Sequence, residues 1–141
     1  MRTLILYLLL LFIPLAHAET AVYTEALTWH PWNTGLNGHN RLLAVEHNGV
    51  MAGYFYNSYR RDTFFAAYRW ARPLRSHWVA SLVVGADYGY SNCLKGQGNP
   101  YAPKRVCPMV VPGISYTAWR AQPTLVLMGD ALSVTLRWRV R

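Results

Sequence analysis

The chain has 141 residues, of which 52% are apolar, and its 14 basic and 6 acidic side chains give a formal net charge of +8. This length fits one domain. Beyond the first eighteen residues no apolar run is long enough for a membrane-spanning helix, which excludes a helical membrane protein. Phosphate-binding glycine loops, dinucleotide fingerprints and zinc signatures are absent, so we expect neither a cofactor nor a metal.

The first eighteen residues have the organisation of an export signal. Arg2 supplies a positive start, residues 4–15 form an apolar stretch, and residues 16–18 form an A-x-A cleavage site. We therefore expect a cleaved signal peptide over 1–18 and a mature domain over 19–141, with an uncleaved anchor as the alternative. Removal of Arg2 leaves 13 basic and 6 acidic side chains, a net charge of about +7. After export we expect anionic lipid as a partner, and no nucleic acid.

Strand signals recur along the whole mature chain, and no segment has the pattern of a helix. Short segments with period-two alternation, bounded by turn residues, are typical of a β-barrel. The eight expected strands cover residues 22–30, 41–47, 50–57, 63–71, 77–90, 108–116, 121–128 and 132–140. In the last of them Leu132, Val134 and Leu136 alternate with Ser133 and Thr135, which gives one apolar face and one polar face.

The connections between these strands also favour a barrel. Asn48-Gly49 is the strongest short hairpin signal in the chain. The long connections 31–40, 58–62 and 91–107 fall at one end, the short ones 48–49, 72–76 and 117–120 at the other, and only 129–131 is short on the loop side. Outer-membrane barrels segregate their loops in this way. We predict an all-β, eight-stranded antiparallel up-and-down transmembrane β-barrel, monomeric, in the outer membrane of a Gram-negative bacterium. A soluble periplasmic barrel or sandwich is the alternative.

Proline recurs near the sixth and seventh strands. Pro108 and Pro112 lie inside the sixth expected strand, and Pro123 opens the seventh. Proline removes a ladder hydrogen bond and is confined to strand edges, bulges and strand starts. These residues indicate either a bulge or displaced boundary, or a local gap in the barrel wall through which a lipid chain enters sideways.

Cys93 and Cys107 flank the longest connection. In an oxidising compartment we expect them to form a disulfide, because exported proteins commonly pair their cysteines. The bridge would stiffen a loop rich in glycine and proline by roughly 3 kcal/mol. Its role is structural in this interpretation.

Three candidate catalytic residues fall at the same rim of the expected barrel. His30 ends the first strand and Asn57-Ser58 ends the third, and both strands run in the same direction. A serine, a histidine and a polar orienting group are the components of acyl transfer. A solvated histidine and an ordinary Asn-Ser turn are the alternatives.

Several short segments, in this order and spacing, are similar to the lipid A palmitoyltransferase (PagP-type) family. The segments are Thr28-Trp29-His30, Tyr56-Asn57-Ser58-Tyr59, Ala66-Ala67-Tyr68-Arg69-Trp70, Arg72-Pro73-Leu74 and the proline-rich stretch from Pro103 to Pro112. They span about residues 22–141, with diverged sequence between them.

The resemblance implies an outer-membrane barrel whose interior holds a phospholipid acyl chain and transfers palmitate to lipid A. His30 matches the family's histidine and Ser58 its serine, whereas Asn57 stands where the family has an aspartate. Asparagine carries no negative charge to orient a protonated histidine, so enzymatic activity stays open, with Asp62 as a candidate substitute. Glu25 replaces a proline of the family's first strand.

The alternative function is a non-catalytic outer-membrane barrel that binds lipopolysaccharide or a surface partner through its outer loops. Its basis is the basic outer edge formed by Arg41, Arg60, Arg61, Lys95, Lys104 and Arg105. Small residues expected to point inward, namely Gly53, Ala67, Ser81 and Gly85, leave space for an acyl chain. The intervals between His30, His39 and His47 fit no metal-ligand motif.

Overall fold

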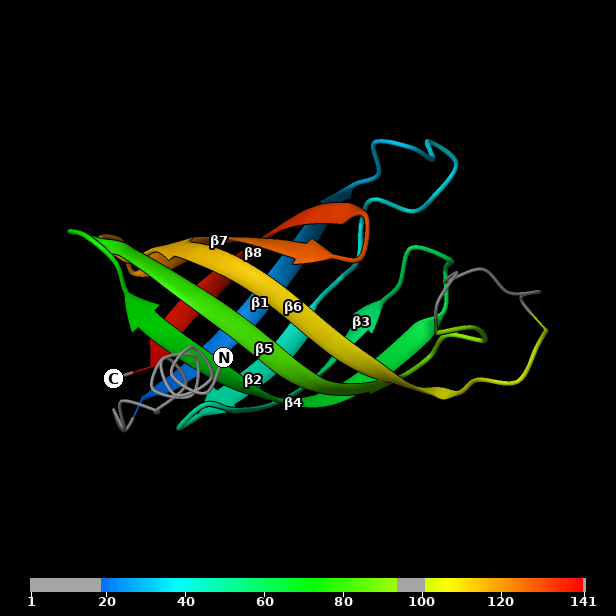
Figure 1. Cartoon of the computed structure of the whole chain (residues 1–141), viewed down its shortest axis with the longest axis horizontal. Helices are drawn as coiled ribbons and strands as arrows, with labels where there is room; N and C mark the ends of the chain where they lie inside the picture. Colours follow the sequence, from blue (N-terminus) through cyan, green and yellow to red (C-terminus); the bar gives the residue numbers. More distant parts are fainter. Residues whose placement is uncertain (1–18, 94–100, 141) are drawn as a thin grey trace, which may run out of the picture.

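The structure, a computed structural model, describes residues 19–93 and 101–140 and consists of one closed antiparallel barrel (Figure 1). Each strand pairs with its neighbours in sequence, and β8 pairs with β1. The strands are β1 (Thr20–Trp29), β2 (Leu43–His47), β3 (Val50–Tyr56), β4 (Asp62–Pro73), β5 (Trp78–Tyr88), β6 (Val106–Tyr116), β7 (Ala121–Met128) and β8 (Ala131–Val140). The predicted fold class is confirmed, and no predicted strand boundary differs by more than two residues.

Two predictions fall on chain segments outside this description. The expected signal peptide over 1–18 and Lys95 of the basic edge both lie outside the described residues. Within the described ranges no helix is long and apolar enough to cross a membrane.

Short turns gather at one end of the barrel and long loops at the other (left and right in Figure 1). The predicted Asn48-Gly49 hairpin joins β2 and β3, with φ of 51° and 84° at its two residues. Positive φ at both positions matches the twist of a two-residue hairpin, which explains the Asn-Gly pair. The end that carries residues 30–42, 57–61, 89–93 and 101–105 is called the loop end below.

The barrel is apolar outside and polar inside. All eight strands expose large apolar side chains: Leu27, Trp29, Leu43, Val45, Val50, Phe64, Trp78, Tyr88, Val106, Val110, Leu125, Leu127, Val134, Trp138 and Val140. Polar side chains are buried instead: Glu46, Thr63, Arg69, Asp87, Ser115, Gln122, Thr124, Ser133, Thr135 and Arg137. The interior also holds an apolar cluster of Ala21, Tyr23, Ala44 and Met51.

Ion pairs fill the interior at the turn end. The carboxylate of Glu46 bridges two buried arginines, at 3.2 Å from Nη1 of Arg69 and 3.3 Å from Nε of Arg137. The hydroxyl of Tyr23 donates to the same carboxylate at 2.6 Å. Arg137 also donates to Gln122 at 2.8 Å and pairs with Glu19 at 3.1 Å. These contacts join β2, β4, β8 and β1 across the barrel and leave the loop end as the half that can hold a cavity.

A bulge in β1 sets which residues of its second half face inward. Glu25 has a φ of 56° and interrupts the β1–β8 register between Thr24 and Ala26. The extra residue turns Ala26 inward, where it is 7% exposed, and leaves Leu27 outward at 52%. Glu25 therefore determines which side chains at the end of β1 point inward, just before His30.

Candidate functional site

A cavity of about 820 Å³ occupies the loop end of the barrel. Phe55, Met109 and Val111 form part of its apolar wall inside the barrel, and loop residues such as Leu36 and Tyr90 form its outer part. Cavities of this size accept a ligand of drug or lipid-chain dimensions. The small inward residues do not create this space. A Cβ built on Gly53 would meet Cβ of Ala44 at 2.4 Å, so that glycine allows two strands to approach closely.

His30 and Ser58 line the same cavity although they follow different strands. Nε2 of His30 is buried and has no hydrogen-bond partner among the described residues. The Ser58 hydroxyl accepts a weak hydrogen bond from Nδ2 of Asn40 at 3.5 Å. A histidine and a serine that line one cavity supply the groups needed for proton transfer during acyl chemistry.

The segment around Asn40 holds these two residues in one wall. The backbone N–H of Asn40 donates to Ala26 in β1, and its carbonyl accepts from Tyr56 in β3, both at 2.8 Å. Because β2 begins only at Leu43, these bonds close the wall between β1 and β3 at the loop end. Asn40 thus fixes the relative position of the two strand ends that carry His30 and Ser58.

Asn57, the third candidate, is not among the residues that line the cavity. Its side chain is fully buried, and Oδ1 accepts from the backbone N–H groups of Tyr59 at 2.9 Å and Arg61 at 3.1 Å. Its Nδ2 donates to Thr63 at 2.9 Å. The amide therefore organises the β3–β4 turn.

Asp62, the expected substitute carboxylate, also lies outside the cavity lining. Its Oδ1 accepts from the hydroxyl of Tyr54 at 2.7 Å, and its side chain is on the exposed side of β4. A different carboxylate reaches the cavity: Asp87, near the end of β5, which is 6% exposed. Its inward direction was readable from the alternation of β5, which also turns Gly85 inward. What the alternation did not reveal is that Oδ1 of Asp87 has no hydrogen-bond partner among the described residues.

The barrel wall loses its pairing between β6 and β7 beside this cavity. These strands pair only from Gly113 to Ser115 on the β6 side, and Figure 1 shows them diverging from there towards the loop end. Pro108 and Pro112 lie inside β6 and keep their places opposite β5, so the ladder lost at these residues is the one with β7. Proline offers no N–H for such a ladder. At these prolines the pairing of β6 with β7 is lost while the β5–β6 register is unbroken, and β6 begins two residues earlier than expected.

The cavity extends along β6 where this strand lacks a β7 partner. Five consecutive residues of β6, Cys107 to Val111, line it. Val110 is 60% exposed on the outer surface.

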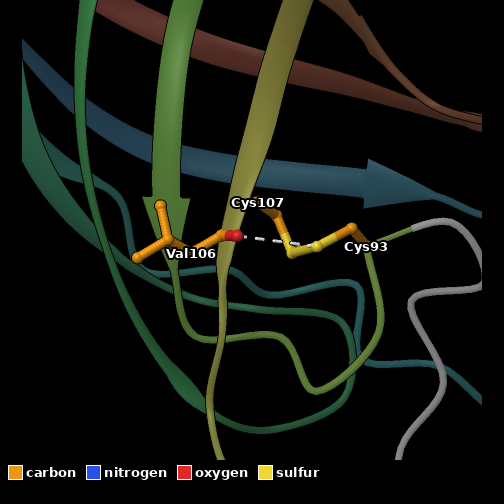
Figure 2. The surroundings of a disulfide bond; sticks show 3 residues. All are labelled: Cys93, Val106 and Cys107. Carbon is orange, nitrogen blue, oxygen red and sulfur yellow. Dashed lines mark hydrogen bonds between the residues drawn. A yellow bond between two sulfur atoms is a disulfide. The ribbon is translucent and has the colours of Figure 1, made fainter.

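The predicted disulfide is present between Cys93 and Cys107, with Cα atoms 5.2 Å apart (Figure 2). Cys107 lies in β6 and Cys93 follows β5, and both line the cavity. The bridge anchors the start of the longest loop to the β6 strand at the edge of the cavity. This is the structural role expected from the sequence.

The basic edge divides into two groups. Arg41, Arg60 and Arg105 are exposed at the loop end. Nη2 of Arg61 donates to the carbonyl of Ala102 at 2.8 Å, and Nζ of Lys104 donates to that of Asp62 at 2.8 Å. The second group ties two loops together, which leaves three of these side chains for external contacts. In residues 19–93 and 101–140, no three His, Cys, Asp or Glu side chains come close enough to hold a metal ion.

The chain matches no protein-family model and no curated protein.

Proposed function

We propose that this chain is an outer-membrane barrel that takes an acyl chain of a phospholipid into its cavity and transfers it to lipid A. The observation that carries the proposal is that His30 and Ser58 line one cavity, beside a stretch of β6 that lacks pairing with β7. The resemblance noted from the sequence points to the same reaction.

The outer surface supports a membrane location. Apolar side chains project from all eight strands, and aromatic residues cluster near both ends of the barrel. At the turn end the rings of Trp78, Tyr116 and Trp119 are in contact, with centroids 5.1 and 5.3 Å apart. At the loop end Tyr54 contacts Phe64 at 5.4 Å. Two aromatic girdles around an apolar band are typical of outer-membrane barrels.

In the proposed reaction, lipid chains enter between β6 and β7. The apolar wall of the cavity holds the donor chain with its ester near the loop end. Nε2 of His30 accepts the proton of the attacking lipid A hydroxyl as the new ester bond forms. That proton then passes to the departing lysophospholipid oxygen, so the base is regenerated. Ser58 supplies a hydroxyl that can donate to the ester oxygen as negative charge develops there.

The test is mass spectrometry of lipid A from Gram-negative cells that express the wild type, His30→Ala, Ser58→Ala or the control His39→Ala. His39 is exposed and does not line the cavity. We expect a lipid A species heavier by one fatty-acyl group with the wild type and His39→Ala, and its loss in the other two. Heat-dependent mobility on gels shows in each case that the barrel is folded. Unchanged lipid A in cells rich in folded wild-type protein would refute acyl transfer.

The exposed arginines favour a second candidate function, non-catalytic binding of lipopolysaccharide. Arg41, Arg60 and Arg105 gather at the loop end, where phosphate groups would meet them. Replacing Arg60 and Arg105 with alanine should then reduce lipopolysaccharide binding. Replacing Arg72 and Arg75, which are exposed near the turn end, should not. Equal binding by the two double variants would rule out a recognition role for the loop-end arginines.

A further inference from the structure

The cavity has an acidic lining in a basic protein. Two aspartates, Asp87 and Asp130, line it, and none of the described lining residues is lysine or arginine. The net charge of the chain is +8, and its loop-end arginines stand outside the cavity. No lysine or arginine among the described lining residues is available to pair with these carboxylates. The cavity presents carboxylates beside an apolar wall, which suits an amphiphile with a cationic group.

Asp87 is the carboxylate best placed for such a group. It projects from β5 between Phe65 of β4 and Cys107 of β6, its partners in register. It is more than nine-tenths buried, and Oδ1 lacks any hydrogen-bond partner in the part of the chain that the structure describes. A buried carboxylate oxygen without a donor is unfavourable, and a hydrogen-bond donor that enters with a ligand would satisfy it.

Two tyrosines line the same cavity as this carboxylate. Tyr59 and Tyr90 line the cavity, and their rings meet nearly edge-on, with centroids 6.0 Å apart. Burial raises the pKa of the Tyr90 hydroxyl above its usual range, and the negative charge of Asp87 adds to this rise, so the two groups are electrostatically close. Aromatic faces next to a carboxylate are a recurring environment for an ammonium group.

We propose that Asp87, with Tyr59 and Tyr90, forms a subsite for the primary ammonium headgroup of a phosphoethanolamine lipid. The placement of the lipid's acyl chain in the cavity rests on the proposed function, whereas the headgroup preference does not require transfer. A primary ammonium fits better than a quaternary one because Oδ1 of Asp87 needs an N–H donor. The hydrogen bond between the ammonium and the carboxylate is charge-assisted and sheltered from water, which makes it strong.

Competition between lysophospholipids of one acyl chain length tests this subsite. Lysophosphatidylethanolamine, lysophosphatidylcholine and lysophosphatidylglycerol are added in equal amounts to the folded barrel in uncharged maltoside micelles, and native mass spectrometry counts the bound species. The wild type should bind the ethanolamine lipid about tenfold more than the glycerol lipid, a difference of about 1.4 kcal/mol. The choline lipid should fall between them.

Two variants assign the preference to its residue. Asp87→Asn keeps the shape of the side chain and should bring the ethanolamine-to-glycerol ratio close to one. Asp62→Asn removes a carboxylate that is exposed and outside the cavity lining, and should leave the ratio unchanged. The headgroup without a chain, glycerophosphoethanolamine, should compete poorly, because the apolar wall holds the tail. Strong competition by this tail-less compound would show a free amine site and overturn the assignment to a lipid.

The wild-type ratio alone can overturn the proposal, since it needs no variant to fold. A ratio near one in the wild type, or a ratio that Asp87→Asn leaves unchanged, would refute the subsite. Its failure is distinguishable from that of the proposed function. Unaltered lipid A together with a strong ethanolamine preference removes acyl transfer only. Transfer to lipid A without any headgroup preference removes the subsite only.

Discussion

The buried ion network at the turn end makes a strong prediction for the Glu46→Gln variant. Glu46 is 4% exposed, and its carboxylate is the one shared by Arg69 and Arg137, themselves 8% and 3% exposed. Glutamine keeps the size of the side chain but loses the charge and turns N–H donors towards guanidinium donors. Loss of one partner from a buried pair costs about 3–5 kcal/mol. We expect this variant to lose that amount of unfolding free energy.

Glu19→Gln is the matched control, because it removes a carboxylate from the edge of the same network. The side chain of Glu19 is 30% exposed and pairs with Arg139, whose side chain is 49% exposed, as well as with Arg137. A partly exposed pair contributes less, about 1 kcal/mol. Urea unfolding in micelles, followed by tryptophan fluorescence, measures both. With a slope of about 2 kcal/mol per M, the midpoint falls by about 1.5–2.5 M for Glu46→Gln and by about 0.5 M for the control. Equal shifts would refute the central place of Glu46.

Three further predictions follow from particular contacts. Asn57→Asp introduces a carboxylate at this position but should not raise the rate of the proposed acyl transfer to lipid A, because the side chain at 57 points into the β3–β4 turn; a faster rate would contradict that placement. Replacing Cys93 and Cys107 with serine should lower the unfolding free energy by roughly 3 kcal/mol, and dithiothreitol should lower the urea midpoint of the wild type equally and leave the variant unchanged. Burial raises the pKa of Glu19, but its contacts with Arg137 outweigh burial, so the pKa in the folded barrel lies below the ordinary value of 4.5. The stabilisation by Glu19 is therefore complete above pH 4.5 and is lost as the pH falls through the lower folded value. A difference in stability between wild type and Glu19→Gln that persists below that value would contradict this.

Strand positions and faces were predictable because the signals for them are local. Alternation in residues 132–140 gave both the limits of β8 and its polar inner face, where Ser133, Thr135 and Arg137 are buried. The Asn48-Gly49 pair located its hairpin because few other residues adopt positive φ at both positions. The bulge at Glu25 was not predictable in the same way. It reverses which residues of β1 face inward, and nothing in the local alternation marks the reversal.

The site was only partly predictable, because contacts across the barrel decide what each inward residue does. His30 and Ser58 were placed at one rim by counting strand directions, and the cavity joins them. The orientation of the Asn57 side chain depends on its hydrogen bond to Thr63 across the turn. The Asn57-Ser58 sequence alone does not reveal this contact. Asp87 was readable as an inward residue, but its lack of a partner depends on the strands around it.

The turn end of the barrel is the closed and well-packed half, and the loop end is the half with the cavity. At the turn end the ladder runs around the whole wall, and Glu46 with its arginines fills the interior. Beyond Gly113, towards the loop end, β6 and β7 are not paired. There the cavity occupies the interior, which side chains fill at the turn end. An unpaired strand edge and an empty interior both reduce stability, so they are tolerated where the rest of the barrel is closed. The Cys93–Cys107 bridge joins β6 to the segment after β5 at this end of the barrel. Strand pairing, packing and covalent linkage therefore place the unpaired stretch of β6 at the cavity that His30 and Ser58 also line.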